Sequence, residues 1–138
     1  MDVPFTPLKA ALSSMSVGLI TTAAPYQPGK GDQGPGAPYN ASAKFFTVYS
    51  GASAVEHDLR ISHISYDRQH TSADDMNTWF PLPALRRAAA RGRFGALARR
   101  FHGAPTNRSQ RITLDVDCME LLQRCREDQL DAVLLVAT

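Results

Sequence analysis

Side chains that can do chemistry are concentrated in one stretch, from His57 to Leu82, which holds three of the four histidines, four aspartates and the one tryptophan. Within it, His63 and Asp67 are four residues apart at the expected end of a strand. A histidine hydrogen-bonded to a carboxylate is held in one orientation and becomes more basic, which suits proton transfer to a leaving amine. His63, Asp67 and the nearby Asp75 are therefore candidate catalytic residues. The alternative is that His63 and Asp67 only stabilise the turn between strand and loop.

Three more side chains of this stretch are candidates for substrate binding: Arg60, Tyr66 and Asn77. Arg60 can hold a carboxylate through two parallel hydrogen bonds, but its position between two apolar residues also fits a solvent-exposed strand face. Asn77 either orients a substrate group or caps the turn before the next helix, and capping is the simpler interpretation. A metal site on the histidines is not expected, because the chain has neither a His-x-x-x-His pattern nor a cysteine pair with ligand spacing.

The two cysteines, Cys118 and Cys125, are too few for a disulfide framework and suggest a reducing compartment. Seven residues apart on one helix, they would be about 10 Å apart along its axis, which is too far for a disulfide. Cys125 is expected to be an inert core thiol. Cys118 is expected near a helix N-terminus, where the dipole favours a thiolate, and it is the candidate reactive thiol.

Composition and charge narrow the class of protein. The chain has 138 residues, 43% hydrophobic residues and a net charge of +2, as expected of one soluble globular domain. Its arginines cluster between Met76 and Leu114, but without interleaved aromatic residues they do not predict a nucleic-acid partner. No run reaches the roughly 18 apolar residues of a membrane span, and the N-terminus is a poor secretion signal. We expect a cytoplasmic protein with no membrane partner.

The apolar pattern predicts alternating strands and helices. The expected strands are 16–24, 45–49, 58–65, 112–116 and 131–138, and the expected helices are 82–91, 94–103 and 119–127, the last capped by Asp117. A long proline- and glycine-rich loop is expected at about 25–44. The last strand is uninterrupted by polar residues, as is typical of a parallel strand buried on both faces. The sequence thus predicts one α/β domain over residues 1–138, with a mostly parallel central sheet of four or five strands flanked by helices.

Several separated motifs occur in a fixed order along most of residues 5–138. They are Asp58-Leu-Arg-Ile-Ser-His63-x-x-Tyr66-Asp67, Asp75-x-Asn77-x-x-Phe80-Pro81-Leu82-x-x-Leu85, Gly92-x-x-Gly95 and the closing Leu-Leu-Gln-Arg-Cys-Arg-Glu-Asp-Gln-Leu-Asp-Ala-Val-Leu-Leu-Val. Together these motifs resemble the selenoprotein B family. Its members are the B-component subunits of glycine, sarcosine and betaine reductases and the related D-proline reductase subunit.

The resemblance implies reductive cleavage of a C–N bond with a dithiol/disulfide couple. In the family the last strand leads into a Sec-x-x-Cys or Cys-x-x-Cys redox centre, which would lie beyond Thr138, so the chain would lack the family's C-terminal part. Either the chain is a natural short relative, or an in-frame UGA codon for selenocysteine was read as a stop. A chain truncated at its C-terminus would have the same sequence. With no cofactor and no pyruvoyl-forming site of its own, the 138-residue chain is expected to be inactive alone.

The partners implied by the resemblance are a small amino-acid or betaine-like substrate, a pyruvoyl-containing subunit and a selenoprotein A-like acceptor. The alternative, from a different class, is a non-catalytic protein that binds a small molecule or assists assembly and keeps the fold without the redox centre.

Overall fold

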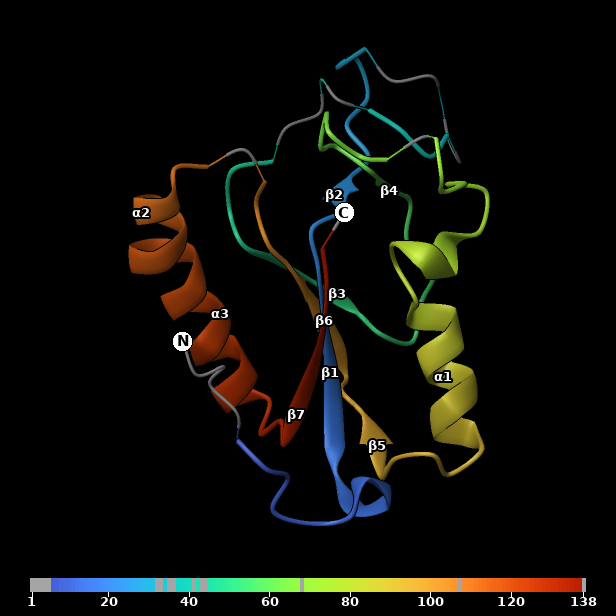
Figure 1. The fold of residues 1–138 in the computed structure, drawn as a ribbon, viewed down its shortest axis with the longest axis vertical. Helices are drawn as coiled ribbons and strands as arrows, with labels where there is room; N and C mark the ends of the chain where they lie inside the picture. The colour runs from blue at the N-terminus through green and yellow to red at the C-terminus, as the bar shows by residue number, and fades with distance from the viewer. Residues whose placement is uncertain are drawn as a thin grey trace.

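Strand β1 (Ser16–Thr21) is the centre of the sheet in this computed structural model, and its neighbours along both edges are parallel to it. Strand β7 (Ala132–Val136) pairs with one edge. Strands β5 (Ala96–Leu97) and β6 (Arg100–Gly103) pair one after the other with the opposite edge, and β3 (Tyr49–Ala52) is antiparallel to β6. The predicted mostly parallel central sheet is therefore confirmed (Figure 1). The structure describes residues 6–31, 34, 37–40, 42, 45–67, 69–106 and 108–137.

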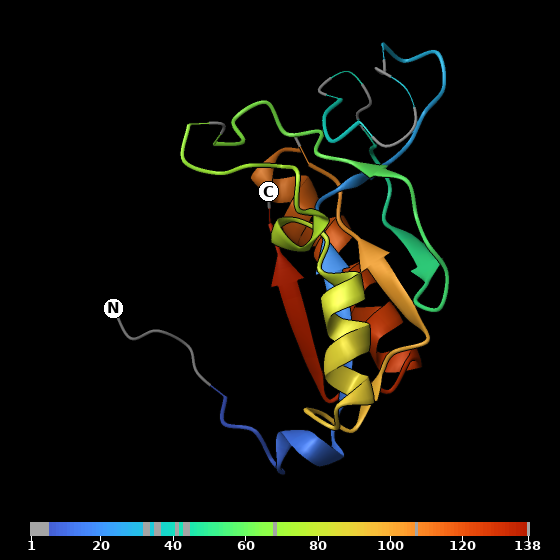
Figure 2. The same ribbon diagram turned by 90° about the vertical axis from the view of Figure 1, so that its right-hand side faces the viewer.

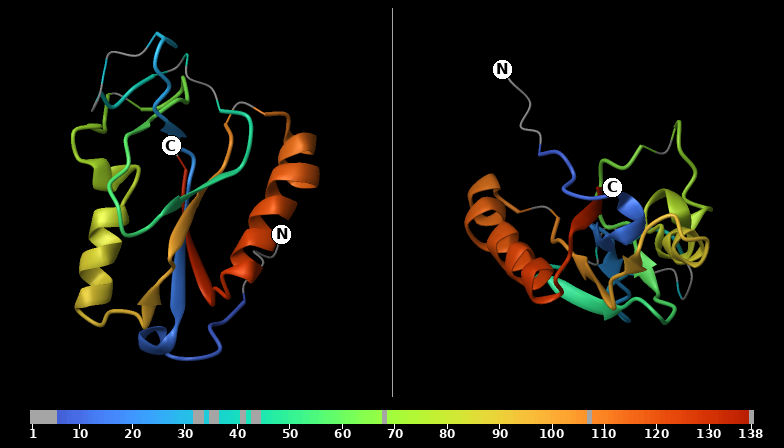
Figure 3. Two further views of the ribbon diagram at one scale, coloured as in Figure 1. Left: turned by 180° about the vertical axis from the view of Figure 1, so that it is seen from behind. Right: turned by 90° about the horizontal axis from the view of Figure 1, so that it is seen from below.

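Helices cover the two faces of this sheet. Helix α1 (Leu82–Ala90) lies on one face, and one continuous helical segment of α2 (Gln110–Ile112), a π-helical turn (Thr113–Asp117) and α3 (Cys118–Glu127) lies on the other. The right-hand view of Figure 3, from below, shows the sheet between these two helical layers. The predicted single α/β domain with flanking helices is confirmed. No helix among the described residues is long and apolar enough to cross a membrane.

Short elements complete the fold at the ends of the sheet. Strand β2 (Ala24–Pro25) pairs antiparallel with β4 (Leu59–Arg60), and two 3₁₀ helices, η1 (Leu12–Ser14) and η2 (Met76–Thr78), precede β1 and α1. Part of the predicted loop at about 25–44 lies outside the described residues. In its described part, Tyr39 forms an isolated bridge with Ile61.

The core lies between the sheet and α1. Leu19 from β1 and Phe101 from β6 meet Trp79, Phe80 and Leu82 from the segment that enters α1, and each is at most 3% exposed. Alternate residues of a strand point to the same face, so Leu19 and Phe101 define the α1 side of the sheet. Burial of these large side chains supplies the main driving force for docking α1.

Two predicted elements are wrong. Residues 94–103 were expected to be helical but form β5 and β6, because pairing with the open edge of β1 outweighs the weak helical pattern of a segment that contains Gly95. Residues 112–116 were expected to be a strand but are helical. The alternation of Ile112, Leu114 and Val116 does not reflect a buried strand face, since Leu114 and Val116 are 56% and 50% exposed.

The beginning of this helical segment also differs from expectation. Ser109, not Asp117, caps it: Oγ of Ser109 accepts a hydrogen bond from the Ile112 backbone N–H at 3.3 Å. Asp117 lies inside the segment, where its buried carboxylate accepts hydrogen bonds from Arg108 at 3.1 and 3.2 Å. The two other predicted strands, at 45–49 and 58–65, are shifted and shortened to β3 and β4.

Strand β7 forms where it was predicted, but its expected burial on both faces is wrong. Val133, Leu134 and Leu135 are 40%, 42% and 63% exposed. The reason is its position, because β7 pairs only with β1 within the described part of the chain and so lies at an edge of the sheet.

Candidate functional site

The parallel strands β1, β6 and β7 end at one edge of the sheet, which we call the carboxyl edge. The backbone N–H of Ala104 donates to the carbonyl of Thr21 at 2.8 Å, and the N–H of Thr22 donates to the carbonyl of Val136 at 3.2 Å. Ligands of open α/β sheets bind outside the carboxyl ends of the strands. A ligand site is therefore expected at this edge.

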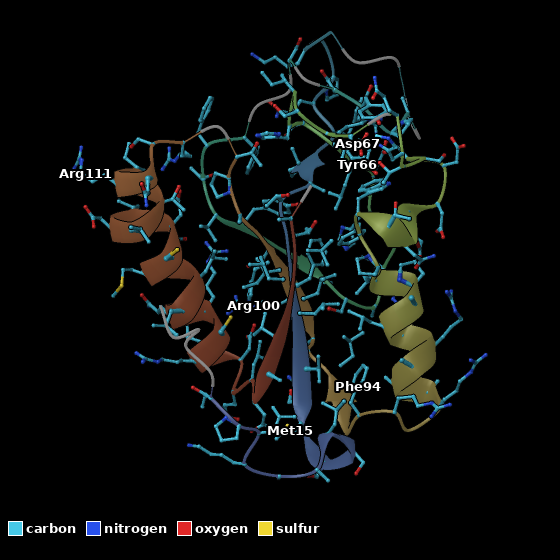
Figure 4. The ribbon with its side chains drawn as sticks, in the orientation of Figure 1. Met15, Tyr66, Asp67, Phe94, Arg100 and Arg111 are labelled. Carbon is cyan, nitrogen blue, oxygen red and sulfur yellow. The ribbon has the colours of Figure 1, made fainter. Side chains whose placement is uncertain are left out.

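The chemically rich segment 57–82 runs over the carboxyl edge. Oγ1 of Thr21 donates to the carbonyl of Trp79 at 3.1 Å, and the hydroxyls of Ser62 and Thr106 are 3.2 Å apart. Figure 2 shows the segment above the end of β7, and Figure 4 shows Tyr66 at the same end of the molecule. The strand predicted at 58–65 is only the two-residue β4, which pairs with β2 outside the central sheet. The contacts of Thr21 and Thr106, and not a preceding parallel strand, place the segment at this edge.

The pairing expected between His63 and Asp67 is not formed. Nδ1 of His63 accepts a hydrogen bond from the backbone N–H of Ser65 at 3.2 Å. Asp67 instead contacts Nδ1 of His70 at 2.9 Å and accepts the backbone N–H groups of Gln69 and His70. The His70 side chain is the main cause of a lowered pKa at Asp67, followed by these two N–H groups.

A turn rather than a helix explains this change of partner. Residues four apart face each other on a helix, but the chain from His63 to Asp67 makes a single turn at Ile64 and Ser65 and is otherwise irregular. The Asp67 carboxylate closes the next turn by accepting the backbone N–H groups of Gln69 and His70, as aspartates in turns commonly do. The acid–base pair at this position is thus Asp67 with His70, both exposed, while His63 is half-buried and separate.

Asp75 and Asn77 are engaged in helix caps. Oδ1 of Asp75 accepts the backbone N–H of Asn77 at 2.9 Å and its side-chain amide at 2.8 Å. These two hydrogen bonds, the backbone one first, lower the pKa of Asp75. Oδ1 of Asn77 accepts the backbone N–H of Ala84 in the first turn of α1 at 3.1 Å. Both side chains therefore position η2 and α1.

Replacing Asn77 by alanine is expected to lower the free energy of unfolding by about 1 kcal/mol, because the N–H of Ala84 loses its acceptor. Urea denaturation followed by circular dichroism measures this change. Gln69→Ala, which removes an exposed amide from the same loop, is the matched control and should change stability by less than about 0.5 kcal/mol. Equal stability of Asn77→Ala and the unmodified protein would contradict the capping role.

Arg60 is fully buried, so the interpretation as a solvated strand face is wrong. Its guanidinium pairs with Asp58 and donates to the carbonyls of Leu59 at 2.9 Å and Gly34 at 2.7 Å. Its central carbon is 4.8 Å from the ring centre of Tyr26, a cation–π contact. Arg60 thus joins β4 to the preceding loop, and a substrate carboxylate would have to compete with these partners.

Tyr66 is half-buried beside the carboxyl edge. Its ring meets that of Tyr39 edge to face, with ring centres 5.6 Å apart, and packs against the core. Tyr66 is therefore the candidate substrate-binding residue whose ring is partly exposed near this edge (Figure 4).

Cys118 is exposed but lies within the continuous helical segment that begins at Gln110, not at a helix N-terminus. The argument from the helix dipole therefore does not apply to it. Cys125 is half-buried, and burial is the main cause of its raised pKa, which fits an unreactive thiol. Among the described residues, no group of three or more histidines, cysteines and acids is placed to hold a metal ion.

His102 is 1% exposed on β6 and was not among the functional residues expected from the sequence. Residues 94–103 were expected to be helical, whereas in strand β6 alternate residues share a face, so Arg100 and His102 both lie on the α3 face of the sheet. There His102 lies opposite Ser50 in the β3–β6 pair. A strand assignment for these residues would have shown a histidine and an arginine on one face.

Acid is expected to destabilise the protein through His102. Burial is the main cause of its lowered pKa; Asp128 opposes the shift, and Arg100 and Arg124 add to it. Below about pH 6.5, the unfolded histidine binds a proton that the folded one does not. The contribution of the neutral, buried His102 to the free energy of unfolding is complete above that pH and declines as pH falls. Urea midpoints from pH 7 to pH 5 should therefore decrease less in His102→Asn than in the exposed control His70→Asn, and identical profiles would contradict this assignment.

Comparisons of the chain with protein-family models, with curated proteins and with solved structures found no match. The resemblance to the selenoprotein B family therefore rests on the motifs of the chain itself and stays a prediction.

Proposed function

We propose that this chain is the N-terminal portion of a B-type reductase subunit whose carboxyl edge binds a small amino acid or betaine. The observation that carries the proposal is that segment 57–82 lies over the end of β7 (Figure 2), the strand that leads to the redox centre in the resembled family. Val136 and Tyr66 pack against the same core cluster. A selenocysteine or cysteine centre following Thr138 would thus start next to the candidate substrate residues.

The proposed reaction is a reductive cleavage. A selenolate or thiolate of the redox centre attacks the substrate carbon, and the amine leaves with the electron pair of the C–N bond and takes up a proton. A second thiolate then attacks the selenium or sulfur atom. The carbon group leaves with that bonding pair and a proton, and a disulfide or selenenylsulfide remains, so the dithiol supplies both electrons. His63 is the candidate proton donor, since Asp67 is engaged by His70.

The proposal includes the partners of the family: a pyruvoyl-containing subunit and a selenoprotein A-like acceptor, with no nucleic acid. It also includes a cytoplasmic location, which two cysteines that are both free thiols support. Cys118 and Cys125 are the chain's cysteines and do not form a Cys-x-x-Cys pair, so no turnover is expected from the purified 138-residue form.

The DNA immediately after the Thr138 codon tests the proposal. A UGA codon, followed three positions later by a cysteine codon and then by more α/β-patterned sequence, would support a selenoenzyme subunit. A UAA or UAG codon without such a continuation would contradict it. Substrate-dependent reductase activity of the 138-residue form would contradict the assignment of the chemistry to a centre beyond Thr138.

A non-catalytic binding protein is the second candidate, and the use of Asp67, Asp75 and Asn77 in turns and caps favours it. Isothermal titration of the 138-residue chain with glycine, sarcosine, betaine and D-proline tests it directly. Saturable binding that is retained in Asp67→Asn, together with a true stop codon, would support this alternative. Absence of binding to all four would reject it for these ligands.

A further inference from the structure

A second polar constellation lies between the sheet and α3, away from the carboxyl edge. Ser50 on β3 and His102 on β6 are registered opposite each other in an antiparallel pair, so both side chains point to the α3 face. Oγ of Ser50 is 2.8 Å from Nδ1 of His102. This distance allows the hydroxyl to donate its proton to the imidazole.

The other ring nitrogen of His102 faces a carboxylate. Nε2 is 3.0 Å from Oδ2 of Asp128, although the contact is too bent to count as an aligned hydrogen bond. Asp128 is itself held by Nε of Arg100, at 2.9 and 3.0 Å from its two oxygens. A proton on Nε2 faces the negative charge, which leaves the lone pair of Nδ1 for Ser50. Burial keeps the imidazole neutral near pH 7, so it can act as a base.

A cation adjoins the serine oxygen. Nη1 of Arg124, from α3, donates to Oγ of Ser50 at 2.6 Å, and its Nη2 group reaches the carbonyl of Val48 at 3.3 Å and Glu120. A guanidinium at this place stabilises negative charge that develops on the serine oxygen or on an acyl group attached to it. The arrangement therefore has a nucleophile, a base, an orienting acid and a positive charge.

Ser50, which is half-buried, lines a cleft of about 690 Å³ between β3, β6 and α3. Figure 4 shows Arg100 in the space between the ribbon of α3 and the sheet. The charged walls of the cleft are two arginines and two glutamates: Arg100, Arg124, Glu120 and Glu127. Arg100 pairs with Glu127, and Arg124 with Glu120, so these walls carry no net charge. Such a cleft suits a small uncharged acyl compound better than an anion.

We propose that Ser50, His102 and Asp128 form a nucleophilic site that hydrolyses small uncharged esters or thioesters. Oγ of Ser50 attacks the acyl carbon while its proton passes to Nδ1 of His102, and that proton then goes to the leaving alcohol or thiol. Water attacks the acyl-serine with His102 again as base, releasing the carboxylic acid and restoring Ser50. Compared with the serine-hydrolase triad, the two ring nitrogens exchange roles.

The test is covalent labelling of the purified 138-residue chain with a small ethyl fluorophosphonate at pH 8, followed by peptide mass mapping. The phosphonyl group is expected on Ser50, with fluoride as the leaving group, and Ser50→Ala should remove the label. His102→Asn should slow labelling by about 100-fold or more, the usual contribution of a general base. Ser13→Ala, which changes an exposed serine in η1, is the control and should leave the rate unchanged.

Labelling of Ser50 no faster than of Ser13 would overturn the proposal, as would an unchanged rate in a folded His102→Asn variant. If that variant does not fold, the pH profile of the unmodified chain decides. Burial lowers the pKa of His102, so the rate should decrease only at a pH below the ordinary histidine value of about 6.5, where the folded imidazole gains a proton and ceases to be a base. A rate that stays level over the whole acidic range in which the chain remains folded would show that the contact between Ser50 and His102 is only structural.

Discussion

Replacing Phe101 by alanine is expected to lower the free energy of unfolding by about 3–5 kcal/mol, the usual cost of removing a buried phenylalanine. Phe101 is 1% exposed at the centre of the core. Its ring centre is 4.8 Å from that of Phe80, 4.8 Å from that of His57 and 6.1 Å from that of Tyr49, in each case edge to face. The substitution removes all three contacts and leaves a cavity on the α1 face of the sheet.

Urea denaturation at pH 7, followed by tryptophan fluorescence, measures this loss, because Trp79 belongs to the same core cluster. Phe46→Ala is the matched control, since Phe46 is 50% exposed and its replacement should cost about 1 kcal/mol or less. Similar losses in the two variants would mean that Phe101 does not occupy the centre of the core.

Replacing Gly103 by alanine should be the second most damaging change, at about 1–3 kcal/mol or more. A Cβ atom on Gly103 would lie 1.7 Å from Cε1 and 2.1 Å from Cζ of Tyr49. The Tyr49 ring cannot move away without cost, because its hydroxyl donates to the carbonyl of Ala23 at 2.6 Å. Gly103 therefore permits the close approach of β6 to this ring.

A double-mutant cycle tests this explanation. In a Tyr49→Ala background the clash is absent, so adding Gly103→Ala should change the urea midpoint little, and the two effects should be strongly non-additive. Gly18→Ala is the control. Its Cβ would meet the Cδ1 atom of Leu130 at 2.3 Å, at the far end of a flexible side chain, so a smaller loss is expected. Equal costs of Gly103→Ala in both backgrounds would contradict the explanation.

The elements predicted correctly have strong local patterns. Strand β1 is a β-branched run that ends before Pro25, and α1 combines a proline in its first turn with one apolar stripe. The segments predicted wrongly, 94–103 and 112–116, are short, and their apolar residues fit either period. Residues 94–103 form strands because they hydrogen-bond to β1. Strand β1 is distant in the sequence, so no local pattern indicates this pairing.

Segment 57–82 lies over the carboxyl edge, but the pairing predicted within it is wrong. The strand predicted at 58–65 shortens to β4, which pairs with β2 and not with the parallel sheet. The partner of Asp67 depends on whether the backbone from His63 to Asp67 forms a turn or a helix. The spacing of the two residues in the sequence does not determine this. Ser50 and His102 are 52 positions apart, so only the register of two strands brings them together.

The exposed strand β7 has a consequence for how the protein behaves in concentrated solution. Residues 132–137 are all uncharged, and lysines, prolines and bulges are the usual means by which proteins prevent one sheet edge from pairing with another. Within the described residues, the outer side of β7 has no strand partner, and an unpaired apolar edge is a template for association between molecules. We therefore expect the 138-residue chain to associate through β7 as its concentration rises.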